Sequence, residues 1–222
     1  MKRILFVGVL LLLAVPIAYY FLGPQGKVKA LPVINPIDVQ QDMVDPEMLR
    51  IGKGHRVGAF RFQNQDAQWI TDADMRGRVS VVEYFFTTCK SICPIMNSQM
   101  ERIQKKFSGQ PDVRIFSFTV DPETDTVARM KRCATQHHAK AGQWHFLTGE
   151  KSALYALARR SFFVLKPAEA QNLGDAGSDF IHTNNFVLID QKMRIRGYYD
   201  GTNPKEVSLL QAHIEQLLAD PQ

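Results

Sequence analysis

Two long apolar runs with an amphipathic segment between them set the strongest limit on how this chain can fold. The runs at residues 79–86 (VSVVEYFF) and 113–120 (VRIFSFTV) are rich in β-branched and aromatic residues, as strands buried on both faces are. The segment between them carries apolar side chains at helical spacing: Met96, Met100, Ile103 and Phe107. This order of elements predicts two parallel strands with the helix covering one face of their sheet.

The pattern from residue 52 onward extends this unit into a larger sheet. The predicted elements are a hairpin around 64–66, a helix at about 126–138, a strand at 144–147, a helix at 150–162, a hairpin around 191–192 and a last helix with its apolar stripe at 207–217. Two β-rich halves joined by helices, with a hairpin and a helix at the end, are typical of a thioredoxin-like α/β sandwich.

The N-terminus predicts attachment to a membrane. The run from Ile4 to Leu22 contains no charge and, as a helix of about 28 Å, matches a bilayer core of about 30 Å. Lys2 and Arg3 precede it, so the positive-inside rule keeps the N-terminus in the cytoplasm. A cleaved signal peptide is the alternative, but no small-residue cleavage motif follows Leu22. We expect a single-pass protein of the cell inner membrane with its domain on the periplasmic side.

Composition divides the rest into a spacer and a domain. The proline-rich residues 23–51 lack periodicity, which predicts a tether between the anchor at 1–22 and one compact domain at 52–222. The formal net charge is +5, and the lysines and arginines are scattered rather than clustered with aromatic residues. A nucleic-acid partner is therefore not expected.

Two of the three cysteines, Cys89 and Cys93, lie between the first long strand and the following helix. Reactive groups gather at the carboxyl ends of parallel strands, and a helix N-terminus together with Lys90 favours thiolates there. A structural disulfide is the plainest interpretation of the pair. Redox exchange is a second one, although its usual spacing is one residue shorter. A soft metal, above all copper(I), is a third, and it calls for a further ligand.

The six histidines offer one candidate for that ligand. Four are expected to be surface residues: His55, His137, His138 and His213. His145 fits a packed strand position. His182 stands where a loop enters a strand among polar neighbours, so it is the candidate metal ligand, although a lone histidine is more often structural.

Four motifs, taken together, resemble the Sco (SenC) family of membrane-tethered, thioredoxin-fold copper proteins. They are FFTTCKSICPIM, FTVDPETDT, WHFLTG and FIHTNNFVLIDQKMRIRGYYDGT, and they span about residues 52–210 in the order typical of that family. The resemblance implies a copper(I) or copper(II) carrier rather than an enzyme, with metal ligands Cys89, Cys93 and His182. Its implied partner is the subunit of cytochrome c oxidase that carries the dinuclear copper centre.

The resemblance also leaves an alternative and a departure. Some members of the family are linked to thiol-disulfide exchange, so Cys89 and Cys93 are candidates for a redox-active disulfide. A proline commonly follows the first cysteine in the family, whereas this chain has Lys90. Asp121 and Asp125 match an acidic motif, and we expect them to form caps and loop hydrogen bonds.

Three other sulfur-bearing residues are expected to have structural or solvent-exposed positions. Cys133, on a predicted helix, is expected to be a half-buried structural thiol. Met43 and Met48 are expected to lie in a solvated tether rather than to bind copper.

Overall fold

The structure, a computed structural model, describes residues 30–164 and 184–219. The chain divides between residues 30 and 31, and the fold described here is that of the second unit. Within the described ranges no helix is both long and apolar enough to cross a membrane. The predicted anchor at 1–22 and the tether residues up to 29 lie outside these ranges.

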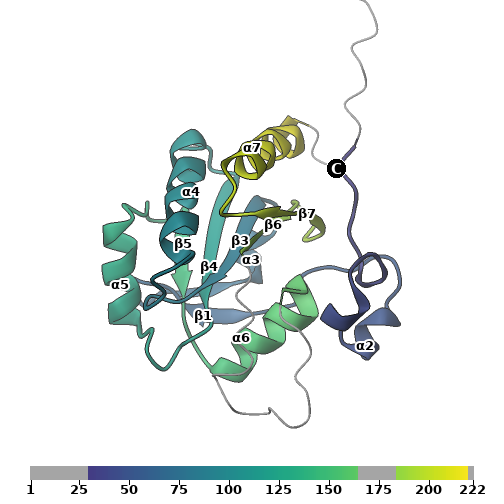
Figure 1. The fold of residues 1–222 in the computed structure, drawn as a ribbon, viewed down its shortest axis with the longest axis horizontal. Helices are drawn as coiled ribbons and strands as arrows, with labels where there is room; N and C mark the ends of the chain where they lie inside the picture. Colours follow the sequence, from purple (N-terminus) through teal and green to yellow (C-terminus); the bar gives the residue numbers. More distant parts are fainter. Residues whose placement is uncertain (1–29, 165–183, 220–222) are drawn as a thin grey trace, which may run out of the picture. The chain divides into compact units, whose positions relative to one another are not determined.

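A five-stranded mixed sheet in the order β5-β4-β3-β6-β7 forms the centre of the domain (Figure 1). Its strands are β3 (Val79–Phe85), β4 (Val113–Thr119), β5 (Trp144–Leu147), β6 (Asn185–Ile189) and β7 (Ile195–Asp200). The first three are parallel, whereas β6 runs antiparallel to β3 and β7 antiparallel to β6. The predicted parallel pair is therefore confirmed, because crossovers through a helix return the chain in the same direction.

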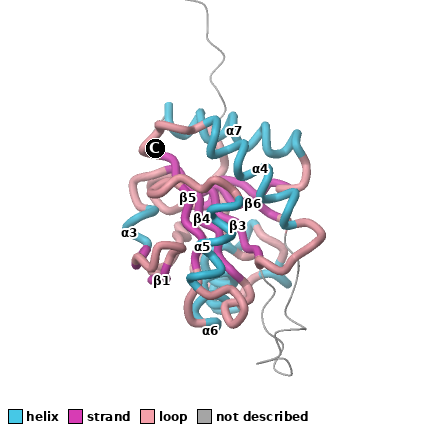
Figure 2. Tube along the Cα trace, turned by 90° about the vertical axis from the view of Figure 1, so that its left-hand side faces the viewer, coloured by secondary structure: helices cyan, strands magenta, loops and turns pink. Residues whose placement is uncertain are grey.

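Three helices cover one face of this sheet: α4 (Cys93–Lys106), α5 (Val127–Gln136) and α7 (Pro204–Ala219). Figures 1 and 2 show α4 and α7 together on the same side of the strands. The predicted apolar stripe of α4 is fully buried here, as is that of α7 at Val207, Leu210 and Ile214. The stripes point inward because each recurs once per helical turn.

The opposite face is covered by α6 (Lys151–Leu157) with the π-helical turn η3 (Ala158–Phe162), by α3 (Asp72–Met75) and by the hairpin of β1 (Arg61–Gln63) and β2 (Trp69–Thr71). The register of the hairpin, with Phe62 opposite Ile70, agrees with the turn predicted at residues 64–66. Apolar side chains from both layers fill this second core. The predicted α/β sandwich is therefore confirmed.

Residues 31–51 depart from the predicted tether, because they pack onto the domain. They contain η1 (Pro36–Asp38), η2 (Gln41–Met43) and α2 (Pro46–Leu49). Val44 is 2% exposed, and Met48 packs against the same core, so a solvated position was wrong for Met48. The buried Arg196 donates to the backbone carbonyls of Leu31 and Pro32 and pairs with Asp190. Backbone carbonyls are present at every residue, so the sequence does not reveal these contacts and predicts a spacer instead.

Candidate functional site

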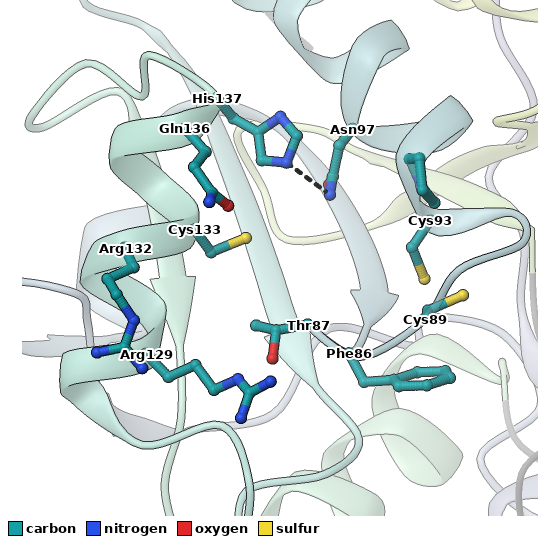
Figure 3. A pocket seen from close by; sticks show the side chains of 11 residues that line it. Phe86, Thr87, Cys89, Cys93, Asn97, Arg129, Arg132, Cys133, Gln136 and His137 are labelled. Carbon is teal, nitrogen blue, oxygen red and sulfur yellow. Dashed lines mark hydrogen bonds between the residues drawn. The ribbon is translucent and has the colours of Figure 1, made fainter.

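The two cysteines lie where β3 is followed by α4, with Cys89 on the short connection between them. Cys93 is the first residue of α4, and Pro94 follows it within the first helical turn, as predicted. The backbone N–H of Cys89 donates to the carbonyl of Phe86 at 3.2 Å, which folds the connection into a turn. This turn places both sulfur atoms side by side at the carboxyl end of β3, the central strand of the sheet (Figure 3).

Asp125 holds this connection against the end of β4. Its carboxylate is fully buried and accepts from the Thr87 backbone N–H at 3.1 Å, from the Thr87 hydroxyl and from the Thr119 hydroxyl at 2.6 Å. Asp121 accepts more weakly from the backbone N–H of Thr124 at 3.4 Å. The loop hydrogen bonds predicted for both aspartates are confirmed. Because Thr87 is two residues before Cys89, Asp125 fixes the position of the first thiol.

The two thiols have different environments. Burial raises the pKa of Cys89, but hydrogen bonds from the side chains and backbone of Cys93 and Ser91 outweigh it and lower the pKa to about 7. Burial raises the pKa of Cys93 far above its ordinary value, and the adjacent Cys89 adds to this. Cys89 is partly exposed, whereas Cys93 is 5% exposed. The pair therefore combines an accessible, readily ionised thiol with a protected neutral one.

A pocket of about 560 Å³ opens beside this pair, and α5 forms its opposite wall (Figure 3). Arg129, Arg132, Cys133 and Gln136 line that wall. They share one face of the helix because they are spaced at i, i+3, i+4 and i+7. Cys133 is 7% exposed, and burial together with the charges of Glu83 and Asp125 raises its pKa to about 12. It is thus buried rather than half-buried as predicted, and all three cysteines line this pocket.

A buried carboxyl lies in the strand that leads to the cysteines. Glu83 is fully buried in β3, and its Oε1 accepts from the Ser117 hydroxyl at 2.5 Å. Ser117 in turn accepts from Trp144 Nε1 at 2.8 Å. Glu83 Oε2 has no hydrogen-bond partner within the described part of the chain. Burial, only partly offset by the Ser117 hydrogen bond, raises the pKa of Glu83 to about 7.

Comparisons with known proteins show the family of this chain. The SCO1/SenC family matches residues 50–219. The chain belongs to the SCO1/SenC family. It is 34% identical over 149 residues to a SCO1 protein homolog of Bacillus subtilis, covering 66% of this chain and 75% of that one.

Solved structures of Sco proteins share the fold. BsSco, a member of the Sco family of cytochrome c oxidase assembly proteins in which a disulfide switch has been identified, is 29% identical with a TM-score of 0.60. That match covers 73% of this chain and 93% of BsSco. Bradyrhizobium japonicum ScoI, solved with copper bound, is 21% identical with a TM-score of 0.54, over 72% of this chain and 99% of that one. The second likeness establishes the fold alone.

Two histidines of this SCO1/SenC chain lie deep in the domain. His145 is buried in β5, as predicted, and burial lowers its pKa to about 4. His55 was predicted at the surface but is 2% exposed, with its Nε2 2.9 Å from the carbonyl of Ser161. Burial lowers the pKa of His55 as well. The sequence gives no sign of this because His55 is covered by η3, which lies far away along the chain.

The other described histidines are nearer the surface. His138 is exposed, as predicted, whereas His137 and His213 are half-buried. His213 Nδ1 lies 2.6 Å from the hydroxyl of Tyr199. His137 lines the pocket, with Nδ1 2.7 Å from Glu101 and Nε2 3.1 Å from the side-chain amide of Asn97. His137 and His213 were predicted at the surface but are half-buried, because each packs against a neighbouring side chain.

His182, the predicted third metal ligand, lies outside the described residues. Within the described ranges no group of three or more histidine, cysteine or acidic side chains is arranged to hold a metal ion. The structure thus brings together two of the three predicted donors. It also adds Glu83, Arg129 and Arg132 to the surroundings of the thiols. The sequence did offer one sign of Glu83, because it is the single carboxylate in the apolar run at 79–86.

Proposed function

We propose that this chain is a membrane-anchored, thioredoxin-like copper metallochaperone that delivers copper to the dinuclear copper centre of cytochrome c oxidase. The observation that carries the proposal is the unequal thiol pair, Cys89 and Cys93, at the open edge of a pocket. Membership of the SCO1/SenC family and the assembly role of BsSco support the choice of acceptor.

The donor set suits copper as a cargo that must later be released. Thiolate sulfur is a soft donor that favours copper(I). Cys89 and Cys93 supply two thiolates, and we assign His182 as the imidazole donor. Three protein ligands leave one side open, where an acceptor's ligands can enter and take the ion stepwise. A closed four-ligand site of the structural zinc type has no such opening.

The redox state of the pair controls this loading. When Cys89 and Cys93 form a disulfide, both sulfur donors are lost and copper has no thiolate to bind. The disulfide switch identified in BsSco supports a pair that cycles between the two states. The two cysteines are four residues apart, and their side chains lie within hydrogen-bonding distance of each other, so closure requires little movement of the chain.

The anchor gives the domain its working position. We propose that residues 1–22 hold the protein in the inner membrane as a single span, with the domain on the periplasmic side. Tethering a carrier to the membrane of its acceptor raises their effective concentration for each other. Added protease should then remove the domain from spheroplasts, and protection of the domain would contradict this orientation.

Thiol-disulfide exchange on a partner's cysteines is the second candidate. The accessible Cys89 with its pKa of about 7 favours it, because such a thiol is ionised and nucleophilic near neutral pH. The buried Cys93 would then resolve the mixed disulfide. This chemistry needs both cysteines but no histidine.

Anaerobic copper(I) titration of the reduced protein distinguishes the candidates. Cys89→Ser and Cys93→Ser should each abolish tight binding, while His182→Ala should weaken copper(I) retention less and change the copper(II) spectrum more. Cys133→Ser is the matched control and should bind normally. If His182→Ala left copper(I) affinity and the copper(II) spectrum unchanged, the three-donor site would be wrong and thiol exchange would become the better account. Failure of the wild-type protein to bind copper would reject the carrier altogether.

A further inference from the structure

The wall opposite the two thiols carries positive charge that the site described so far does not use. Arg129 and Arg132 line the pocket, and the described residues that line it include no carboxylate. Arg132 is exposed and forms no ion pair within the described part of the chain. Arg129 lies 3.9 Å from Asp125, a carboxylate that already accepts from Thr87 and Thr119. The pocket can therefore accept a negatively charged group beside these two arginines.

A second, independent feature in the pocket points to a ligand. Asn97 is 5% exposed and lines the cavity. Its amide nitrogen donates to His137 at 3.1 Å, but its buried Oδ1 has no hydrogen-bond partner among the described residues. A buried acceptor left unpaired costs free energy that an incoming N–H donor would recover. Figure 3 shows Asn97 on the α4 side of the cavity, across from the arginines of α5.

We propose that this pocket binds an acidic peptide segment of the partner protein and thereby places the partner's neighbouring cysteine against Cys89. Carboxylates of the segment pair with Arg129 and Arg132, and one of its N–H groups donates to Asn97. A peptide is the ligand class that supplies N–H donors, carboxylates and a thiol within a few residues. The proposal rests on the thiol-disulfide exchange between Cys89 and a partner's cysteine that is described under the proposed function.

The geometry gives the arginines a positioning role. They lie on α5, while the two thiols lie across the cavity, Cys89 before α4 and Cys93 at its first residue, so a bound segment must pass beside the sulfur atoms (Figure 3). Cys89 is partly exposed whereas Cys93 is buried, so Cys89 is the thiol that a partner meets first. Paired charges at the opposite wall would orient the partner without contacting the reacting atoms.

The exchange of disulfides gives a readout that needs no copper. The probe is a peptide of sequence Asp-Glu-Cys-Gly-Glu-Asp whose thiol is carried as a disulfide with 2-thiopyridine. The thiolate of Cys89 attacks the peptide sulfur and forms a mixed disulfide, and the 2-thiopyridine anion leaves and is followed by absorbance. The thiolate of Cys93 then attacks the sulfur of Cys89 and expels the peptide thiolate. The protein dithiol loses two electrons, and the peptide disulfide gains them.

The matched probe is Asn-Gln-Cys-Gly-Gln-Asn with the same leaving group. Reduced full-length protein in neutral detergent should react about fivefold faster with the acidic probe, a ratio typical of two exposed ion pairs. In the double variant Arg129→Gln/Arg132→Gln the ratio should fall close to one. It should also collapse at about 1 M salt, where the screening length is about 3 Å.

Lys131→Gln is the control, because Lys131 lies on the same helix but lines a different cavity and pairs with Asp66. It changes the net charge by one unit, as Arg132→Gln does, and should keep the acidic preference. An unchanged ratio in the double variant, or an equal loss in Lys131→Gln and Arg132→Gln, would overturn the proposal. Arg132→Gln alone tests the idea if the double variant is unstable. The same variants should bind copper as the wild type does. If the wild-type protein binds copper but does not prefer the acidic probe, the pocket's role is rejected and the carrier function is not.

Discussion

The buried carboxyl of Glu83 should make the stability of this domain fall as the pH rises. Its pKa is raised from 4.5 to about 7 in the folded chain, because burial penalises the charged form. The folded state therefore binds the proton more tightly than the unfolded state does. The stability this proton gives is complete below about pH 4.5 and is lost as the pH rises through about 7. A difference of about 2.5 pKa units corresponds to about 3 kcal/mol.

Urea denaturation of a chain beginning at residue 30, measured at about pH 5 and about pH 8, tests this value. The wild-type domain should lose about 2.5 kcal/mol across that interval through Glu83. Glu83→Gln keeps an acceptor for the Ser117 hydroxyl and cannot ionise, so it should lose correspondingly less. Glu123→Gln is the control, since that side chain is 76% exposed. Equal pH dependence in the wild type and Glu83→Gln would refute the argument that Glu83 is the buried titrating group.

Three further outcomes follow from the geometry around the thiols. Thiolate absorbance should titrate with a midpoint near pH 7, and this transition should disappear in Cys89→Ser. The midpoint should rise in Ser91→Ala, because the Ser91 hydroxyl lies 3.5 Å from the Cys89 sulfur. A transition that persists in Cys89→Ser would assign the ionisation to another group. Asp125→Ala should lower the free energy of unfolding by about 1–3 kcal/mol, because the Thr87 and Thr119 donors lose their acceptor. An unchanged midpoint in chemical denaturation would contradict this. Mass mapping after air oxidation should find a Cys89–Cys93 disulfide with Cys133 unpaired, and a dominant link to Cys133 would contradict the assigned pair.

The order of strands and helices was predictable because each element carries its own period. The continuous apolar run of β3, the helical recurrence in α4 and the alternation in the β1–β2 hairpin all depend on residues close together in the chain. The predicted ends of β3 and β4 each exceed the observed ones by one residue, where apolar character continues beyond the last strand pairing. Local pattern therefore fixed the types of these elements better than their ends.

Contacts between distant segments were beyond such reasoning. The packing of residues 31–51 depends on Arg196, whose guanidinium contacts carbonyls more than 160 residues away in the chain. The burial of His55 depends on Ser161 in the same way. Around the site, motif and spacing pointed to Cys89 and Cys93 as candidates. The facing wall of α5 could not be foreseen, because it depends on how the sheet brings the two helices beside each other.

The inequality of the two thiols also implies an order of events for the proposed copper transfer. Near neutral pH, Cys89 is about half ionised, whereas Cys93 remains protonated. Copper(I) should therefore meet the sulfur of Cys89 first, and the proton of Cys93 leaves only as the metal displaces it. Release reverses this order: a partner's ligand that weakens the bond to Cys93 allows its buried sulfur to regain a proton. The protein then returns to the state in which a single accessible thiolate is ready for the next ion.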